Sequence, residues 1–594
     1  MSSSPLTELT DLISAVIMLE GKQIDSSYML LSIQVRKEVN KIPTATIEIA
    51  DGDPALSDYP ISNDDQLKPG TAIEIKAGYH SNETTVFKGV ITKIGLYAGP
   101  SGSTLTIECR DTSAKMASIR KNKFYKDQKD SEIMESIIAG YSLTSSVKAT
   151  TYTHKEIIQY YCTDWDYILS RADVNGMVII ADDGKITIDN PLSNASSALQ
   201  LTYGFDIIEF NIEMDSQMQL SGSTAASWDP STQSVVSSSG SNPTVPSSGN
   251  ITPSTLSGIL NSENYILQSG GQMSTDDLKS WADAQLIKSW LSRIQGKIKF
   301  QGNAGIKPGV LLTIDGVGKR FNGDVYINSV VHELSEGNWI TTAGIGLSHE
   351  WFADDHAPGA ASASGVLPAV KGFQIGVVKQ IDEDPANEFR VLVKLPVMQQ
   401  DNDGIWARLI QFYATDQAGY FFFPEIDDEV ILGFLNEDPR YPVIVGSVYS
   451  SSRKPVLTPD KKNGMKALIT KSQLKIEFDD ENKILKVVTP ANNIIELNDK
   501  DQLINITDQQ NNSIKFSSSG IEIKSASDIV LNATGKISMS ANTEIDISAQ
   551  SDVKIAGLNI NNTANIGFTG KGNATAELSA SGQTTVKGAI VMIN

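Results

Sequence analysis

Residues 520–559 read GIEIKSAS DIVLNATG KISMSANT EIDISAQS DVKIAGLN, five octads in succession. Each octad carries an apolar pair with one residue between its members, and these ten residues are Ile521, Ile523, Ile529, Leu531, Ile537, Met539, Ile545, Ile547, Val553 and Ile555. A small residue follows each pair two positions later, namely Ser525, Ala533, Ala541, Ala549 and Gly557. Because side chains alternate between the two faces of a strand, each octad predicts a short strand with one apolar face, followed by a polar turn.

A single chain offers these apolar faces no obvious place of burial. The inward residues are too small to fill the wide interior of a single-chain solenoid, whereas three chains around one narrow axis would bury them. We therefore predict an intertwined trimeric β-helix, or β-prism, with the ten paired residues on its axis. An ordinary run of antiparallel strands is the alternative, and such a run rarely keeps a strict octad over five units.

The segment before the octads also alternates between apolar and polar residues. SQLKIEF, KILKVV, NIIEL, QLINI and NSIKF recur at spacings of about seven to eleven residues between Ser472 and Phe516. We expect these leading strands to belong to the same prism.

Composition limits the classes of partner. The 594 residues include 49 basic and 70 acidic side chains, a formal charge of −21, which disfavours nucleic acid and anionic membrane surfaces as partners.

Cys109 continues the inward alternation of Leu105 and Ile107, so it predicts a buried thiol rather than a disulfide with Cys162. No run approaches the ~18 apolar residues of a membrane helix, and Leu12–Leu19 lacks a basic leader. If the protein leaves the cell, we expect a carrier other than a cleaved signal.

The rest of the chain predicts a mainly β, multi-domain protein. The expected order is a β module over 1–115, an α+β module over 116–300 with an exposed Ser-rich loop over 221–257, a second β module over 301–355, a linker over 356–371, a small closed barrel of the OB-fold type over 372–450, a connector over 451–470 and the prism over 471–594. Helices are expected at SEIMESIIAGY, at TDWDYILSRAD with a capping box from Thr163 to Asp166, and from Ser274 to Gln295. We expect Trp281 and Trp290 on the last helix to pack in a core or a subunit interface.

No motif predicts catalysis, a cofactor or a metal. His349 and His356 in HEWFADDH lack the HExxH spacing, and the DNDG at Asp401–Gly404 lacks the remaining ligands of a calcium loop, so a solvated turn is expected there. The barrel region 371–450 has six basic and thirteen acidic residues, which argues against a nucleic-acid groove.

Four segments in this order resemble VgrG, the tip protein of type VI secretion systems, and the equivalent spike of extracellular contractile injection systems. They are VNKIPTATIEIADGD (39–53), CTDWDYILSRADVNGMVIIADDGKITI (162–188), YFFFPEIDDEVILGFLNEDPRYPVIVGSVYS (420–450) and VKGAIVMIN (586–594). The resemblance covers nearly the whole chain. It implies a homotrimer with a phage-tail-hub-like region up to about residue 355, an OB-fold collar and a β-helical needle.

The resemblance also implies partners. The hub would contact an Hcp-like inner tube protein and baseplate proteins, and its two β modules would convert the sixfold tube into threefold symmetry. The blunt end would bind a PAAR-type tip protein through Val586, Ile590, Val591 and Ile593. Only Ser451–Ile469 separates barrel and needle, which is too short for the lysozyme that some phage relatives carry there, so any effectors are expected on other polypeptides.

The sequence therefore predicts a non-enzymatic spike that joins the inner tube to the tip and punctures the target-cell envelope when a sheath contracts. It would assemble in the bacterial cytoplasm and then act in a secreted or lysis-released particle. Two alternatives belong to other classes. One is a trimeric β-helical hydrolase of polysaccharide or cell wall, although the outward octad positions hold no aromatic residue. The other is a receptor-binding adhesin, for which the Ser-rich loop is the one candidate segment.

Overall fold

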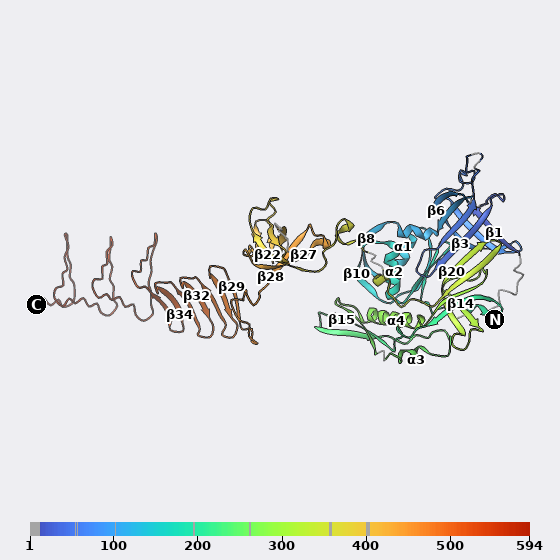
Figure 1. Ribbon diagram of the computed structural model, residues 1–594. Helices are drawn as coiled ribbons and strands as arrows, with labels where there is room; N and C mark the ends of the chain where they lie inside the picture. The colour runs from blue at the N-terminus through green and yellow to red at the C-terminus, as the bar shows by residue number, and fades with distance from the viewer. Residues whose placement is uncertain are drawn as a thin grey trace. The chain divides into compact units, whose positions relative to one another are not determined.

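The computed structural model describes residues 12–593, apart from residues 54, 56, 101, 194–196, 261–262, 356–358 and 399–403. Strands far outnumber helices in this described part (Figure 1). The chain divides into two compact units, one reaching Val448 and the other beginning at Tyr449.

The first β module contains the strands nearest the N-terminus. These are β1 (Ile13–Leu19), β2 (Lys22–Gln23), β3 (Leu30–Glu38), β4 (Thr44–Ala50), β5 (Ala72–Tyr79), β6 (Asn82–Gly99) and β7 (Gly102–Arg110), paired in the order β3-β4-β7-β6-β5-β1-β2. Strict alternation buries every second residue, as in Ala45, Ile47 and Ile49 of β4. Cys109 is a buried free thiol, as predicted, and burial raises its pKa to about 12.

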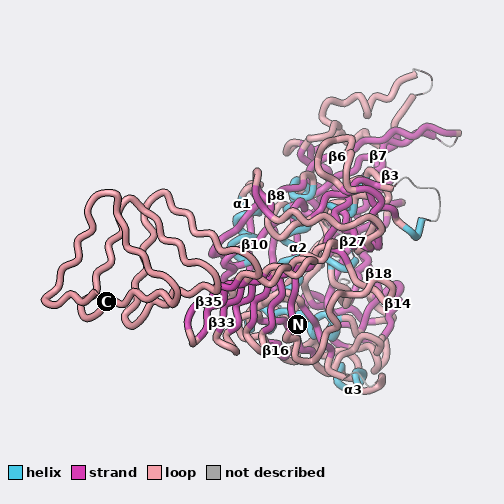
Figure 2. The backbone as a smooth tube through the Cα atoms, turned by 90° about the vertical axis from the view of Figure 1, so that its left-hand side faces the viewer, coloured by secondary structure: helices cyan, strands magenta, loops and turns pink. Residues whose placement is uncertain are grey.

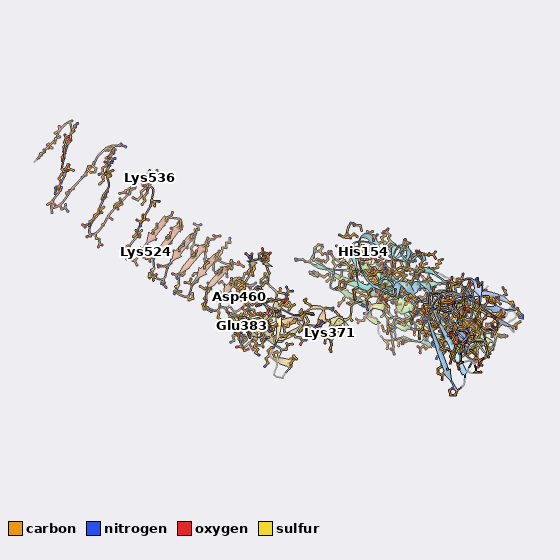
Figure 3. The ribbon with its side chains drawn as sticks, turned by 90° about the horizontal axis from the view of Figure 1, so that it is seen from above. His154, Lys371, Glu383, Asp460, Lys524 and Lys536 are labelled. Carbon is orange, nitrogen blue, oxygen red and sulfur yellow. The ribbon has the colours of Figure 1, made fainter. Side chains whose placement is uncertain are left out.

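An α+β insertion follows. Its elements are η2 (Thr112–Ala117), β8 (Arg120–Lys129), α1 (Asp130–Ala139), β9 (Thr144–Val147), β10 (Thr153–Thr163), α2 (Asp164–Val174), β11 (Val178–Asp182) and β12 (Lys185–Asp189). Of the predicted capping box the N-cap half is present, since Thr163 Oγ1 accepts a hydrogen bond from the Asp166 amide at 3.0 Å. Asp130 at the start of α1 lies beside His154, labelled in Figure 3, and Arg171. Burial alone would raise the pKa of Asp130, but hydrogen bonds from His154 and Arg171 outweigh it and hold that pKa well below its usual range.

The second β module begins earlier than expected. It comprises β13 (Ser197–Thr202), β14 (Ile207–Met214), β18 (Ile294–Gln301), β19 (Leu311–Asp315), β20 (Gly323–Ser335) and β21 (Asn338–Ile345). The predicted start of this module at residue 301 is therefore wrong. β13 pairs in parallel with β19 and β14 pairs with β18, so the sheet closes across a long insertion that local patterns do not reveal.

The Ser-rich segment 221–257 is ordered structure rather than the expected exposed loop. The segment and its neighbours form β15 (Ser223–Asp229), β16 (Ser234–Ser239), α3 (Pro253–Ser257), β17 (Tyr265–Ser269) and α4 (Thr275–Leu291). Small residues allow close approach: Ala225 is buried, and Ser223 Oγ donates to the Ala282 carbonyl of α4 at 2.6 Å. Composition alone suggested disorder because Ser and Ala contribute little apolar area, yet here they fill a tight sheet–helix interface.

Helix α4 ends at Leu291, before the predicted end at Gln295. Ile294, which was expected on the apolar face of this helix, is instead the first residue of β18. The two tryptophans expected in a core or a subunit interface are both partly buried. Trp281 packs partly buried against the β15–β17 sheet, and Trp290 Nε1 donates to the Leu220 carbonyl at 3.2 Å.

One ladder joins the two β modules into a continuous sheet. Residues Ser329–Ser335 of β20 pair with Ser32–Glu38 of β3. His332 is buried at this joint, and its Nδ1 lies 3.0 Å from Thr341 Oγ1. Burial, with a smaller contribution from the nearby Lys37 charge, lowers the pKa of His332 to about 3, so the ring is neutral at pH 7. Lys37, also buried, pairs with Asp182 and Asp183 of the insertion.

The predicted closed barrel is present. The segment contains α5 (Phe352–Asp355), η3 (Ser362–Gly365), β22 (Gln374–Gln380), β23 (Val391–Lys394), η4 (Pro396–Met398), β24 (Ile405–Leu409), β25 (Ala414–Thr415), β26 (Ala418–Gly419), β27 (Glu429–Phe434), η5 (Leu435–Glu437) and β28 (Pro442–Ser447). The barrel closes in the order β22-β23-β24-β28-β27 around a buried core that includes Val378, Val393 and Leu432. Of the expected linker, residues 356–358 lie outside the described part.

The second unit contains a seven-stranded sheet. Its strands are β29 (Met465–Ile469), β30 (Lys475–Asp479), β31 (Ile484–Val488), β32 (Ile494–Asn498), β33 (Leu503–Thr507), β34 (Ser513–Ser517) and β35 (Gly520–Lys524). All five leading strands expected from the sequence are therefore present. β29 begins within the expected connector, which ends at Gly464 rather than at residue 470. Beyond Lys524 the described residues continue as turns and loops (Figure 2).

Candidate assembly surface

The strands β29–β35 form one antiparallel meander in which each strand pairs with the next along the chain. Their register places two columns of apolar residues on one face. The first column contains Ile476, Val487, Ile495, Ile506, Ile514 and Ile523, and the second contains Phe478, Leu485, Leu497, Ile504, Phe516 and Ile521. Nine of the ten column residues on β30–β34 are 36% to 45% exposed. This face, called here the apolar face, is therefore open in the described part of the single chain.

The opposite face has a polar central column, and its outer columns mix polar residues with the partly buried Ile484, Val488, Ile494 and Leu503. Across the strands its central column contains Glu477, Lys486, Glu496, Asn505, Lys515 and Glu522. Opposite charges adjoin within it, and Lys486 Nζ lies 3.8 Å from Glu496 Oε2. Such cross-strand pairs contribute modestly, about 0.2–1 kcal/mol each, and they are compatible with water. The two faces therefore differ, since one presents two wholly apolar columns and the other has a polar column at its centre.

The turns of the meander repeat every two strands. At three equivalent positions a side-chain oxygen accepts a backbone amide hydrogen from four residues later, with donor residues Leu474, Asn493 and Asn512 and acceptors Thr470, Thr489 and Asp508. The residue before each donor has a positive φ, at Gln473, Asn492 and Asn511. These positions are 19 residues apart, so a two-strand unit recurs with that period.

The sequence reasoning did not detect this 19-residue period. The signal that was available is the triplet Ile-x-Phe at Ile476, Ile-x-Leu at Ile495 and Ile-x-Phe at Ile514. The period ends at the turn Ser518–Ser519 between β34 and β35, which has two residues where the other turns have four or five. There the chain passes into the octads.

A groove of about 590 Å³ runs over the distal part of the apolar face. It is lined by residues that include Val487, Ile495, Ile506, Ile514, Ile523 and the octad residue Ile529. The hollow therefore continues the first apolar column toward the octads.

The structure places the ten predicted axis residues in two different settings. Ile521 and Ile523 lie in β35, where they pair with Phe516 and Ile514 and so extend the two columns. The other eight lie in the described segment 525–593, which contains no strand, and Figure 3 labels Lys524 and Lys536 on either side of this transition. All ten are 51% to 69% exposed. The trimeric β-helix beyond residue 524 stays a prediction.

The four predicted tip-contact residues are also exposed. Their exposed fractions range from 48% for Val591 to 91% for Ile593, and Val586 and Ile590 lie between these values. No described strand contains them.

The barrel offers structural ion pairs rather than a reactive cluster. Arg390 Nη2 lies 2.7 Å from Asp384 Oδ1, and this guanidinium holds the pKa of Asp384 well below its usual range. Arg440 has the same relation to Asp438, at 2.7 Å. Within the described residues, no three His, Cys, Asp or Glu side chains gather in a way that would hold a metal ion. His356 and the Asp401–Asp403 turn lie outside these residues.

No helix in the described ranges has both the length and the apolar character needed to cross a bilayer.

Comparison with known families concerns first the large N-terminal region. The family model described as the Alg8 N-terminal domain matches residues 9–336, more than half of the chain. The chain belongs to the Alg8 N-terminal domain family. In this member the match reaches from β1 to β20 and so includes strands of both β modules and the ladder that joins them. A second model, described as the type VI secretion system/phage-baseplate injector OB domain, matches residues 374–449, the closed barrel.

This Alg8 N-terminal domain member is similar over shorter stretches to spike proteins. It is 28% identical over 203 residues to the type VI secretion system spike protein VgrG1b of Pseudomonas aeruginosa, covering 31% of this chain and 27% of that protein. It is 34% identical over 103 residues to VgrG3 of Vibrio cholerae, covering 16% of this chain and 10% of that one. The chain therefore spans well under a third of the length of either relative.

A solved structure of a type VI secretion component from Escherichia coli aligns at 14% identity with a TM-score of 0.38, covering 73% of this chain and 99% of that one. The barrel match and the named relatives show that the chain is similar to VgrG spike proteins and to a phage-baseplate domain, the resemblance that the sequence predicted.

Proposed function

We propose that this chain is the spike of a contractile injection system, a homotrimer that joins the inner tube to the tip and punctures the target envelope when the sheath contracts. In this proposal residues up to about 355 form the hub, the barrel over 372–450 forms the collar, and the needle runs from Met465 to the last residue.

The observation that carries the proposal is the open apolar face of the meander. Twelve aliphatic or aromatic side chains point from one side of an intact sheet, whereas the centre of its other side is a column of charged and amide side chains. A two-sided sheet of this kind needs a cover, since apolar area left in water is unfavourable by roughly 25 cal/mol per Å². The apolar faces of the same sheet in two further chains would cover it along its whole length.

A shared axis also accounts for the octads. Ile521 and Ile523 continue the columns of the meander, and the next four octads repeat the same pair. Strands from three chains would satisfy the backbone groups that lack a ladder within the described segment 525–593. An unbroken apolar axis surrounded by ladders resists bending, which is the property that a puncturing device requires.

The proposed partners are those that the resemblance to VgrG implies, and the charge of the chain is a further constraint on them. The hub end would contact an Hcp-like tube protein and baseplate proteins, and the distal end would bind a PAAR-type tip protein through Val586, Ile590, Val591 and Ile593. Effectors would travel as separate polypeptides. The spike would assemble in the bacterial cytoplasm and leave it within a tail-like particle, and a charge of −21 per chain disfavours nucleic acid as a partner.

Light scattering on the purified full chain tests the shared axis. The expected mass is about 192 kDa, three times the 64.1 kDa of one chain. A stable monomer at micromolar concentration would contradict the proposal.

The proposal includes no enzymatic activity. If the chain were instead a hydrolase, purified protein would reduce the turbidity of peptidoglycan or capsule suspensions, and one carboxylate substitution would abolish that effect. We expect no turbidity loss.

A further inference from the structure

The octads do not by themselves determine which residues of three chains meet. Their first apolar positions hold Ile, Ile, Ile, Ile and Val, and their second hold Ile, Leu, Met, Ile and Ile, all aliphatic or thioether side chains of similar volume. A chain displaced by one octad therefore presents nearly the same axis to its neighbours and loses contacts only at the ends. Register is weakly specified wherever a pattern matches itself after a shift.

The meander repeats as well, but one of its columns is not uniform. The first column places Ile476, Ile495 and Ile514 at equivalent points of successive 19-residue units. The second column places Phe478, Leu497 and Phe516 at the neighbouring equivalent points, opposite Leu485, Ile504 and Ile521. Along the chain these three side chains are therefore large, medium and large.

We propose that Phe478, Leu497 and Phe516 set the axial register of the three chains, and the inference rests on the trimer proposed above. The occupant of the apolar face is the same segment of two further copies. In register, three phenyl rings meet at residue 478, three Leu side chains at 497 and three rings at 516. A chain displaced by one two-strand unit brings a ring against Leu side chains at one layer and Leu against rings at another.

An apolar interior does not readily accommodate such mismatches between a phenyl ring and Leu. Interiors pack as densely as organic crystals, so a ring placed where Leu fits overpacks its layer, while Leu placed where a ring fits leaves a void. No comparable penalty arises in the first column or in the octads, whose residues are nearly uniform.

The ladder transmits this register to the octads. Strand β35, which contains the first octad pair, is hydrogen-bonded to β34 from Ser513↔Lys524 to Ser517↔Gly520. Phe516 lies directly opposite Ile521 in that ladder. The octads of each chain therefore begin at a height fixed by the rings of the meander.

Two variants of the full chain remove the size pattern with opposite changes in volume. Leu497→Phe places a ring at all three equivalent positions 478, 497 and 516, and the double variant Phe478→Leu/Phe516→Leu places Leu at all three. Ile495→Phe is the matched control, because it adds a ring on the same strand and the same face as Leu497→Phe but leaves the middle unit different from the units on either side.

A spin label at Ser548→Cys, an exposed outward octad position, reports the register by pulsed dipolar spectroscopy. The native Cys109 and Cys162 are buried, and burial raises the pKa of both thiols, so they react slowly under native conditions. One narrow interchain distance is expected for the wild-type pattern and for the control. Both uniform variants are expected to keep the trimeric mass and to add a second population, displaced along the axis by about 10 Å, the height of two strands.

A single distance in both uniform trimers would mean that the register is set elsewhere, for example in the hub, and would overturn the inference. Two populations in the control would attribute the effect to added volume rather than to the pattern, with the same consequence. A monomeric wild-type chain would instead refute the proposed trimer, and light scattering separates that outcome from the other two. If one uniform variant fails to fold, the other decides.

Discussion

Replacing Ile506 with Asp should convert the trimer into monomers. Ile506 lies on β33 in the first apolar column and is 41% exposed in the single chain. Covering the exposed part of this side chain is worth about 1 kcal/mol per chain, since full burial of Ile contributes about 1.5–3 kcal/mol. The substitution removes that contribution and places three carboxylates at one apolar axis.

The charge dominates the expected effect. An ion buried without a partner costs several kcal/mol even after relaxation, so three copies make trimer formation less favourable by about 10 kcal/mol or more. Because about 1.4 kcal/mol corresponds to a factor of ten, the association constant should fall by roughly seven orders of magnitude. At micromolar protein the variant should therefore be a monomer.

The control is Asn505→Asp, which adds the same charge on the same strand but on the polar face. Asn505 lies between Glu496 and Lys515 in the ladder, and its amide donates to Thr507 Oγ1 at 3.0 Å. The change should alter stability by about 0.5 kcal/mol or less. Light scattering should give about 192 kDa for this control and 64.1 kDa for the Ile506→Asp variant. Trimers in both cases would refute the assignment of the inward face, and monomers in both would show that charge on either face disrupts assembly.

Three further outcomes are expected. Ile537→Asp should remove the protease resistance of the octad segment, whereas Ser538→Asp at the neighbouring outward position should retain it, as read by mass spectrometry of digests; equal cleavage would contradict the predicted faces. Lowering the pH from 7.5 to 5 should destabilise the hub by ~2 kcal/mol through His332, because its pKa falls from 6.5 to about 3 on folding and only the unfolded chain binds the proton in that range. In urea unfolding, the His332→Gln variant should lack this part of the pH dependence. If its unfolding free energy varied with pH as in the wild type, the ring would not be neutral and buried. Thr163→Ala should destabilise the hub by about 1 kcal/mol in urea unfolding by removing the acceptor of the Asp166 amide, and a change below ~0.3 kcal/mol would mean that water replaces the cap.

Strands with simple alternation were predictable because their pattern does not depend on the partner strand. The segments around Ile476, Ile495 and Ile514 alternate whether the sheet is covered by a second sheet or by two other chains, and all became strands. The Ser-rich segment was not predictable in this way. Its order depends on the close contact of Ser223 with Ala282, about 60 residues away in sequence, and composition contains no sign of that contact.

The candidate surface was predictable in type but only partly in extent. Paired apolar positions in the octads gave the shared-axis hypothesis, and Ile521 and Ile523 do join the apolar columns. The 19-residue unit was not found, because its turns vary in sequence: Thr470 and Thr489 align with Asp508, and only the backbone hydrogen bonds reveal their equivalence. Phe478, Leu497 and Phe516 became distinguishable from other apolar residues once that period was known.

The ladder between β3 and β20 has a consequence during protein synthesis. Its partners are separated by nearly 300 residues, so at about 5–20 residues per second the β3 edge remains without its partner for roughly 15–60 s after it leaves the ribosome. An unpaired edge is a template for aggregation, and adjacent cations protect such edges. Arg36 and Lys37 lie together on β3. Until Asp182 and Asp183 are synthesised, about halfway to β20, the unpaired charge of Lys37 would repel other nascent chains, so the ion pair of the folded protein leaves this edge protected for roughly the first half of its exposure.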